Sequence, residues 1–151
     1  MVHRGFQVCS LGEIALRTHR MLDMVGFYRD ILGLPSLPGP YPAGTHFFSL
    51  GGEAGSSGIL ALYDARLHPR EFRAGVVERR TSSLHHLALR IPLEEQEALV
   101  SWYEANELEY HIETFDWIGS RGVFTQDPDG NTVELVAYDE VRVKPIEAAQ
   151  L

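Results

Sequence analysis

The two halves of the chain repeat one order of hydrophobic patterns. Residues 13–18 alternate apolar and polar positions, which predicts a half-buried strand, and residues 20–32 carry apolar side chains at helical spacing. Two strand-like runs follow at 45–50 and 58–63, separated by the Gly- and Ser-rich stretch 51–57. The first half therefore predicts a strand, a helix and then two or three strands.

The second half gives the same order. Residues 85–91 read as a strand and residues 93–106 as a helix. Three further strands are predicted, at 109–115, 122–126 and 132–137. The last two are joined by DPDGN, whose Asp-Gly pair is typical of a hairpin turn.

Each predicted helix carries an apolar stripe that should face a sheet. In the second helix the stripe contains Leu99, Trp102 and Tyr103. In the first helix it contains six apolar residues, namely Leu22, Val25, Phe27, Tyr28, Ile31 and Leu32. Gly33 stands where a C-terminal capping glycine is expected.

Equivalent positions of the two halves keep a nearly constant spacing. His86 follows Glu13 by 73 positions, and the triplet centred on Glu134 follows the triplet centred on Ala61 by 73 as well. This register predicts an internal duplication in an α+β protein. We expect one domain over 1–151. Its predicted parts are module one at about 9–63, a linker at about 64–83, module two at about 84–137 and a C-terminal tail at 138–151.

Composition and charge exclude several classes of protein. The formal net charge is −8, which argues against nonspecific nucleic-acid binding, and no apolar run is long enough for a membrane span. The N-terminus lacks the apolar core of a signal peptide. Cys9 is the only cysteine, so neither an internal disulfide nor a cysteine-based zinc site is expected. A cytoplasmic location fits these features best.

The predicted linker is rich in arginine. This segment is interpreted either as a solvated connection or as an arm that meets an anionic ligand or a second subunit. Its five arginines are Arg66, Arg70, Arg73, Arg79 and Arg80.

Strand alternation places three potential metal ligands on the faces opposite the helices. In each strand the apolar residues should face the helix of the same module, so Glu13, His86 and Glu134 should face away from it. Two carboxylates and one imidazole suit Fe²⁺, Mn²⁺, Ni²⁺, Co²⁺ or Zn²⁺, with coordination positions left open. Each residue also has a role without a metal. His86 would be a hydrogen-bonded strand histidine, Glu134 a carboxylate at the rim, and Glu13 a solvated residue or a partner of Arg17 or Arg90.

Other residues are weaker candidates for a site. By alternation His85 should face the helix side as a packed or capping residue, while His46 and His111 are alternative ligands without an assigned face. Arg17 and Arg90 share the face of Glu13 and His86, where they either favour an anionic substrate or pair with a glutamate. The aromatic residues that line a substrate pocket, or else belong to the core, are Phe48, Tyr63, Trp117 and Phe124.

Four segments resemble the vicinal oxygen chelate superfamily, which includes glyoxalase I, extradiol dioxygenases, and the bleomycin and fosfomycin resistance proteins. They are EIALRT from Glu13, FYRDILGL from Phe27, HHLALRI from His85 and DPDGNTVELV from Asp127. The resemblance implies two βαβββ modules that form a curled mixed sheet around a cleft, and a homodimer. It also implies that metal ligands fall at Glu13, Ala61, His86 and Glu134.

Two of these four positions depart from the family pattern. Glu13 stands where His or Gln is more usual, and Ala61 has no group that binds a metal. Ala61 argues against glyoxalase I, whereas extradiol dioxygenases leave that position empty. The expected ligand set is therefore Glu13, His86 and Glu134.

The resemblance implies a divalent-metal-dependent enzyme that acts on a small oxygen-chelating substrate. Lyase, isomerase or epimerase, and ring-cleaving dioxygenase chemistry all fit. The alternative is a metal-free ligand-binding protein of the bleomycin-resistance type, for which the charge of −8 would suit a cationic drug. A transferase of the fosfomycin-resistance type is a third hypothesis, although the sequence contains no phosphate- or thiol-binding signature that favours it.

Overall fold

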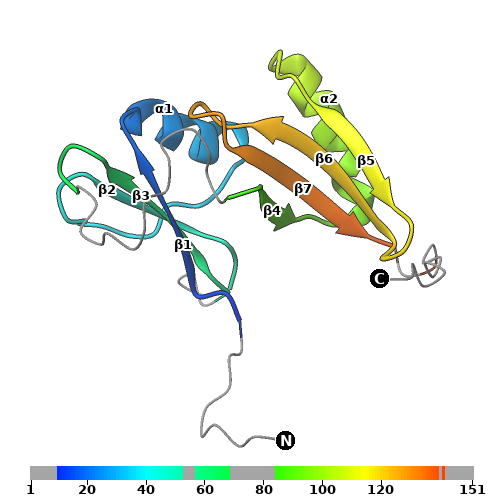
Figure 1. Cartoon of the computed structure of the whole chain (residues 1–151), viewed down its shortest axis with the longest axis horizontal. Coiled ribbons are helices and arrows are strands. Elements are labelled where there is room, and N and C mark those ends of the chain that lie inside the picture. The colour runs from blue at the N-terminus through cyan, green and yellow to red at the C-terminus, as the bar shows by residue number, and fades with distance from the viewer. Residues whose placement is uncertain (1–9, 53–56, 69–83, 140, 142–151) are drawn as a thin grey trace, which may run out of the picture. The chain divides into compact units, whose positions relative to one another are not determined.

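The chain divides into two compact units, residues 1–76 and 77–151. The structure, a computed structural model, describes residues 10–52, 57–68, 84–139 and 141. Each unit combines a sheet of parallel and antiparallel strands with a helix, which confirms the α+β class (Figure 1). Within the described residues, no helix has the length and apolar character needed to span a membrane.

The first unit contains a three-stranded sheet in the order β1-β3-β2, with β1 parallel and β2 antiparallel to β3. Residues 35–37 take the place of a fourth strand beside β2, because Leu37 N–H donates to Phe47 O at 2.9 Å and Ser49 N–H donates to Pro35 O at 2.8 Å. The bounds are β1 Glu13–Thr18, α1 Met21–Gly26, β2 Thr45–Ser49 and β3 Ile59–Asp64. A π-helical turn, Phe27–Ile31, extends α1.

The second unit contains a four-stranded sheet in the order β4-β7-β6-β5. Here β4 runs parallel to β7, and the other neighbours are antiparallel. The predicted DPDGN turn joins β6 and β7, and Gly130 has the positive φ of 81° that such a turn requires. The bounds are β4 Leu87–Arg90, α2 Gln96–Ala105, β5 His111–Phe115, β6 Ser120–Gln126 and β7 Thr132–Tyr138.

The two units repeat the same strand order and the same pairing register. Ala15 pairs with Ala61 in the first unit, and Ala88 pairs with Glu134 in the second. Both partners of the second pair follow those of the first by 73 positions. Ala61 is therefore the structural equivalent of Glu134, as the sequence predicts.

The helix-facing side of each sheet forms the core. In the first unit Leu60, Leu62 and Phe48 are fully buried together with Met24 and Tyr28 of the helix. In the second unit the buried side chains of the same face come from β4, β6 and β7, and Tyr103 covers them from α2. These strand residues are Leu87, Val123, Val133 and Leu135.

Two residues of the predicted helical stripes lie outside the core. Leu22 is 87% exposed and Trp102 is 46% exposed, so their assignment to the buried faces was wrong. The buried stripe of the first helix instead begins at Met24 and continues at Phe27 and Tyr28, three and four residues later. Tyr103 occupies the core position beside Trp102, because neighbouring residues of a helix point about 100° apart.

The predicted linker and tail are only partly described. Arg66 pairs with Asp64 at the end of β3, with Nη2 2.7 Å from Oδ2. Arg70, Arg73, Arg79 and Arg80 lie outside the described residues. Tyr138, which the sequence assigns to the tail, is the last residue of β7.

Gln96 ties the start of α2 to the sheet, and its loss should destabilise the second unit. This side chain is 1% exposed, and its Nε2 donates to Arg121 O at 2.6 Å, while Oε1 accepts from Arg121 Nη1 at 3.0 Å. We expect Gln96→Ala to lower the free energy of unfolding by about 1–3 kcal/mol, because it leaves buried polar groups unpaired. Chemical denaturation measures this, and the exposed Gln126→Ala is the control. Equal stability of both variants would contradict the expectation.

Candidate functional site

The candidate site lies on the face of the second sheet that points away from α2, called here the open face. Strand register places side chains of four strands in rows on this face. One row contains His111, Phe124, Glu134 and Ala88. The next row contains Glu113, Gly122, Val136 and Arg90.

His86 and Glu134 meet on the open face. His86 precedes β4 by one residue, and its Nε2 lies 3.2 Å from Glu134 Oε2. The Glu134 side chain is 7% exposed, whereas that of His86 is 34% exposed and thus accessible to a ligand. The structure thereby brings together the two residues that the sequence predicts as ligands in this unit.

Burial shapes the chemistry of Glu134. Removal from water raises the pKa of the Glu134 carboxyl, and nearby Glu113 adds to the rise, whereas His86 opposes it through charge and a hydrogen bond. A buried carboxylate with one imidazole partner gains free energy from any further positive charge. The open face therefore favours a cation beside this pair.

Gly122 makes room for the Glu134 carboxylate. A Cβ at this position would overlap Glu134 Oε1 and would lie 2.7 Å from Phe124 Cε2. The glycine has no positive φ, so the close approach of the carboxylate, and not the backbone conformation, requires it.

His85 contacts the ring of His86 from the side opposite Glu134. The two Nδ1 atoms lie 2.8 Å apart, so one of them must carry a proton and the other must accept it. His85 is exposed, which corrects the expectation that it packs on the helix side. Its contact fixes the orientation of the His86 ring instead.

An aromatic wall borders the pair on the β5 side. The rings of His111 and Phe124 stack at 4.8 Å with an angle of 8° between their planes, and Phe124 lies 6.0 Å from the His86 ring. His111 Nε2 lies 3.3 Å from Glu113 Oε1. The sequence alone does not show which face of the sheet His111 occupies. The pairing of β5 with β6 decides it, since His111 lies opposite Phe124.

The predicted site residues of the first unit lie on both faces of its sheet. Glu13, Arg17 and Tyr63 share the face opposite α1, where Arg17 Nε donates to His68 O at 2.9 Å. Phe48 points to the helix side, is fully buried and lies 6.2 Å from the Tyr28 ring. It is a core residue, which corrects its assignment to a substrate pocket.

His46 also falls on the helix side of the first sheet. It pairs with Leu62 in the β2–β3 ladder, and its Nε2 lies 2.8 Å from Ser36 Oγ. Burial, reinforced by the charge of Arg29, lowers the pKa of His46. We drop His46 as an alternative ligand because it lies on the face opposite that of Glu13 and is within hydrogen-bond distance of Ser36.

The donors at the open face fit a metal ion in type. Two ligands about 2.1 Å from one ion, at right angles to each other, lie about 3.0 Å apart. The separation of 3.2 Å between His86 Nε2 and Glu134 Oε2 is close to this value, and it equally suits a direct hydrogen bond. Across the described parts of the chain, no group of three or more His, Cys, Asp or Glu side chains is placed to hold a metal.

A family model matches most of the chain. The model of the Glyoxalase/Bleomycin resistance protein/Dioxygenase superfamily matches residues 10–135. The chain belongs to this superfamily. The predicted resemblance is thereby confirmed for nearly the whole sequence.

Several solved structures share the fold. A glyoxalase/dioxygenase from Nostoc punctiforme is similar with a TM-score of 0.67 and 24% identity, covering 93% of this chain and 97% of that one. A lactoylglutathione lyase from Agrobacterium tumefaciens is similar with a TM-score of 0.62 and 24% identity, covering 86% and 94%. The oxidase ChaP-H2 is similar with a TM-score of 0.59 and 18% identity, covering 88% and 96%. A search of functionally curated proteins found no match.

The substitution Gly122→Ala should disturb the site more than the fold elsewhere. The new methyl group forces Glu134 and Phe124 to move, and such overpacking costs about 1–3 kcal/mol. Thermal and chemical unfolding measure the loss. Gly12→Ala is the control, since a Cβ there meets nothing within 4 Å. Unchanged stability of Gly122→Ala would mean that the carboxylate does not occupy this space.

Metal-free protein should show the raised pKa of Glu134 in its stability. A carboxyl whose folded pKa is raised stabilises the fold below its unfolded pKa, and this contribution is lost as the pH rises through the folded pKa. The wild type should therefore lose stability relative to Glu134→Gln as the pH rises above about 4.5, the ordinary pKa of a glutamate. Denaturation curves of both proteins at several pH values test this. A difference that does not change with pH would contradict a raised pKa.

Proposed function

We propose that the protein is a divalent-metal-dependent enzyme that acts on a small substrate with two neighbouring oxygens. The observation that carries the proposal is the approach of His86 Nε2 to Glu134 Oε2 at 3.2 Å on the open face. Membership of a superfamily that includes glyoxalases and dioxygenases supports it. Lyase, isomerase or epimerase, and ring-cleaving dioxygenase reactions remain in the proposed range.

His86 and Glu134 would hold the metal in this proposal. One imidazole nitrogen and one carboxylate oxygen suit Fe²⁺, Mn²⁺, Ni²⁺, Co²⁺ or Zn²⁺. When bound, such an ion polarises a substrate oxygen or lowers the pKa of a bound water. Two protein ligands from this unit leave positions for a bidentate substrate.

The proton arrangement of the two histidines follows from the ligand role. If Nε2 of His86 binds a metal, its proton must stand on Nδ1, which then donates to Nδ1 of His85 at 2.8 Å. Without metal, Nε2–H of His86 donates to Glu134, and Nδ1 accepts from His85. His85 thus provides a hydrogen-bond partner for Nδ1 of His86 both with and without the metal. This contact holds the His86 ring in the orientation that faces Glu134.

Glu13 stays a sequence prediction for a third ligand. By the duplication it is the equivalent of His86 in the first unit, and it is exposed on the face opposite α1. Ala61, the equivalent of Glu134, is fully buried and offers no donor group. The lack of a donor there disfavours glyoxalase I within the superfamily. The homodimer, the cytoplasmic location and the small-molecule substrate also stay predictions.

Metal titration of chelator-stripped protein tests the proposal. We expect one ion of Mn²⁺, Co²⁺, Ni²⁺, Zn²⁺ or Fe²⁺ per chain in isothermal titration calorimetry. His86→Ala and Glu134→Gln should each weaken binding roughly ten-fold or more, because each removes a donor or its charge. Glu13→Gln should weaken it too if Glu13 is a ligand.

The controls are His19→Ala and Glu95→Gln, which change exposed residues of the same types away from the open face. Both should bind metal like the wild type. Failure of all five ions to bind at stoichiometric level would overturn the proposal. The alternative hypothesis, a metal-free ligand-binding protein, would then be favoured.

A further inference from the structure

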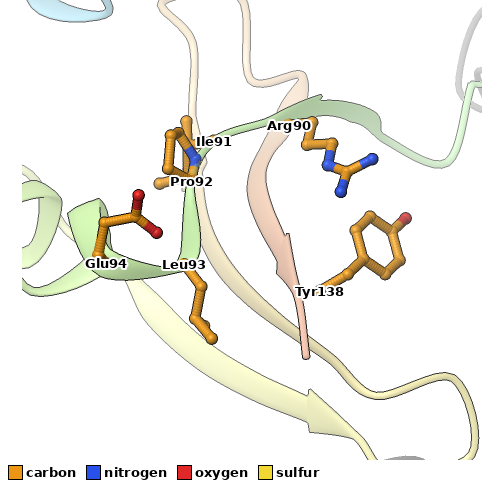
Figure 2. A pocket seen from close by; sticks show the side chains of 6 residues that line it. All are labelled: Arg90, Ile91, Pro92, Leu93, Glu94 and Tyr138. Carbon is orange, nitrogen blue, oxygen red and sulfur yellow. The ribbon is translucent and has the colours of Figure 1, made fainter. Parts of the chain in front are cut away.

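Arg90 and Tyr138 form a second polar pair on the open face. Arg90 ends β4 and Tyr138 ends β7, and Arg90 Cζ lies 5.2 Å from the centroid of the Tyr138 ring. Figure 2 shows the guanidinium and the phenol beside each other at one side of a pocket. A guanidinium that lies over an aromatic ring keeps its N–H groups free in its own plane, where they can donate to an anion.

Arg90 differs from most other arginines in its lack of a carboxylate partner. The described residues include six arginines, of which Arg20, Arg29, Arg66 and Arg121 form salt bridges with Asp or Glu side chains. Within the same residues, Arg17 and Arg90 form none. Of the two, Arg17 Nε donates to a backbone carbonyl, whereas Arg90 lines a pocket. Its charge is therefore available to a ligand.

The pocket beside Arg90 is mixed in character. Its lining comprises Arg90, Ile91, Pro92, Leu93, Glu94 and Tyr138. Apolar side chains lie between the arginine at one side and Glu94 at the other (Figure 2). Because Glu94 would repel a second anion, the lining favours one negative group at the Arg90 end and an apolar body beside it.

The same two strands connect this pocket to the proposed metal pair. Arg90 follows His86 by four residues, and Tyr138 follows Glu134 by four. At the rise of a strand, each separation is about 13 Å. The residues between them on the open face are Ala88, which is exposed, and Val136, which is buried, so both positions between the two polar pairs are apolar.

We propose that Arg90 and Tyr138 bind an anionic group at the far end of the substrate. The chelating oxygens of this substrate would lie at His86 and Glu134, a part of the inference that rests on the proposed function. The substrate class is an elongated acid, with two neighbouring oxygens at one end, an apolar spacer of several carbons, and one carboxylate or phosphate at the other end. Arg90 supplies the charge and the paired N–H donors, and the Tyr138 hydroxyl donates a further hydrogen bond.

Anion binding by metal-free protein tests the subsite by itself. Acetate and inorganic phosphate are titrated at constant ionic strength, and NMR follows the Arg90 Nε–H signal. We expect saturable shifts with a Kd in the range of about 1–10 mM for at least one anion. Tighter binding of acetate would indicate a carboxylate, and tighter binding of phosphate a phosphoryl group. Absence of saturable shifts with both anions would overturn the proposal.

Variants separate the subsite from a general effect of charge. Arg90→Gln should weaken anion binding about ten-fold, the loss expected for a charge-assisted hydrogen bond. In this variant, binding is followed by the signals of neighbouring backbone amides instead of the Arg90 signal. Arg90→Lys should recover only part of the lost affinity, since the planar fork is missing. Tyr138→Phe should weaken binding by a smaller factor. Arg20→Gln changes an exposed arginine just before α1; it is the matched control and should bind like the wild type. Equal binding by Arg90→Gln and the wild type would contradict the assignment.

A matched pair of ligands tests the whole substrate class in metal-loaded protein. α-Oxosuberate and α-oxo-octanoate share a chelating head and chain length, and only the first has a second carboxylate. We expect α-oxosuberate to bind about ten-fold more tightly, with the advantage lost in Arg90→Gln and kept in Arg20→Gln. Equal affinities in the wild type would contradict the elongated acid. If no metal binds while the anion still binds at Arg90, the proposed function fails and the subsite stands.

Discussion

The buried carboxylate of Glu134 is the constraint on which the open face depends. It is nearly enclosed, its pKa is raised by burial, and its described charge partner is the imidazole of His86 at 3.2 Å. A buried carboxylate costs several kcal/mol unless it is paired. Three neighbours meet this constraint in different ways: Gly122 leaves space for it, His86 gives it a partner, and His85 orients that partner.

The two modules differ in polarity at one equivalent buried position. Ala61 and Glu134 occupy the same place in the same register, between a parallel first strand and an antiparallel neighbour. Alanine there is buried without cost, whereas the glutamate needs Gly122 on the neighbouring strand β6 and His86 just before β4. The burial of Glu134 therefore depends on residues of two other segments, whereas the burial of Ala61 does not.

The open face also has a direction along its strands. The proposed metal pair lies near the start of β4, and Arg90 and Tyr138 lie where β4 and β7 end. Because these two strands are parallel, both members of the second pair lie four residues further along their strands than the members of the first. In the proposed complex, residues of the same two strands would bind both the chelating end and the charged end of the substrate.

The sequence by itself determined the elements, their order, the 73-residue register and the shared face of His86 and Glu134. Alternation places Leu87 and Leu89 of β4, and Val133 and Leu135 of β7, on the helix side, which puts His86 and Glu134 on the opposite side even though Val136 shares that side. Only the tertiary structure decided the rest. In Thr45–Ser49, aromatic residues occupy both faces, so the phase of Phe48 became clear only from pairing with β3. The space at Gly122, the His111–Phe124 stack and the Arg90–Tyr138 contact depend on strands far apart in the sequence, and a pattern within one strand holds no information about its partners.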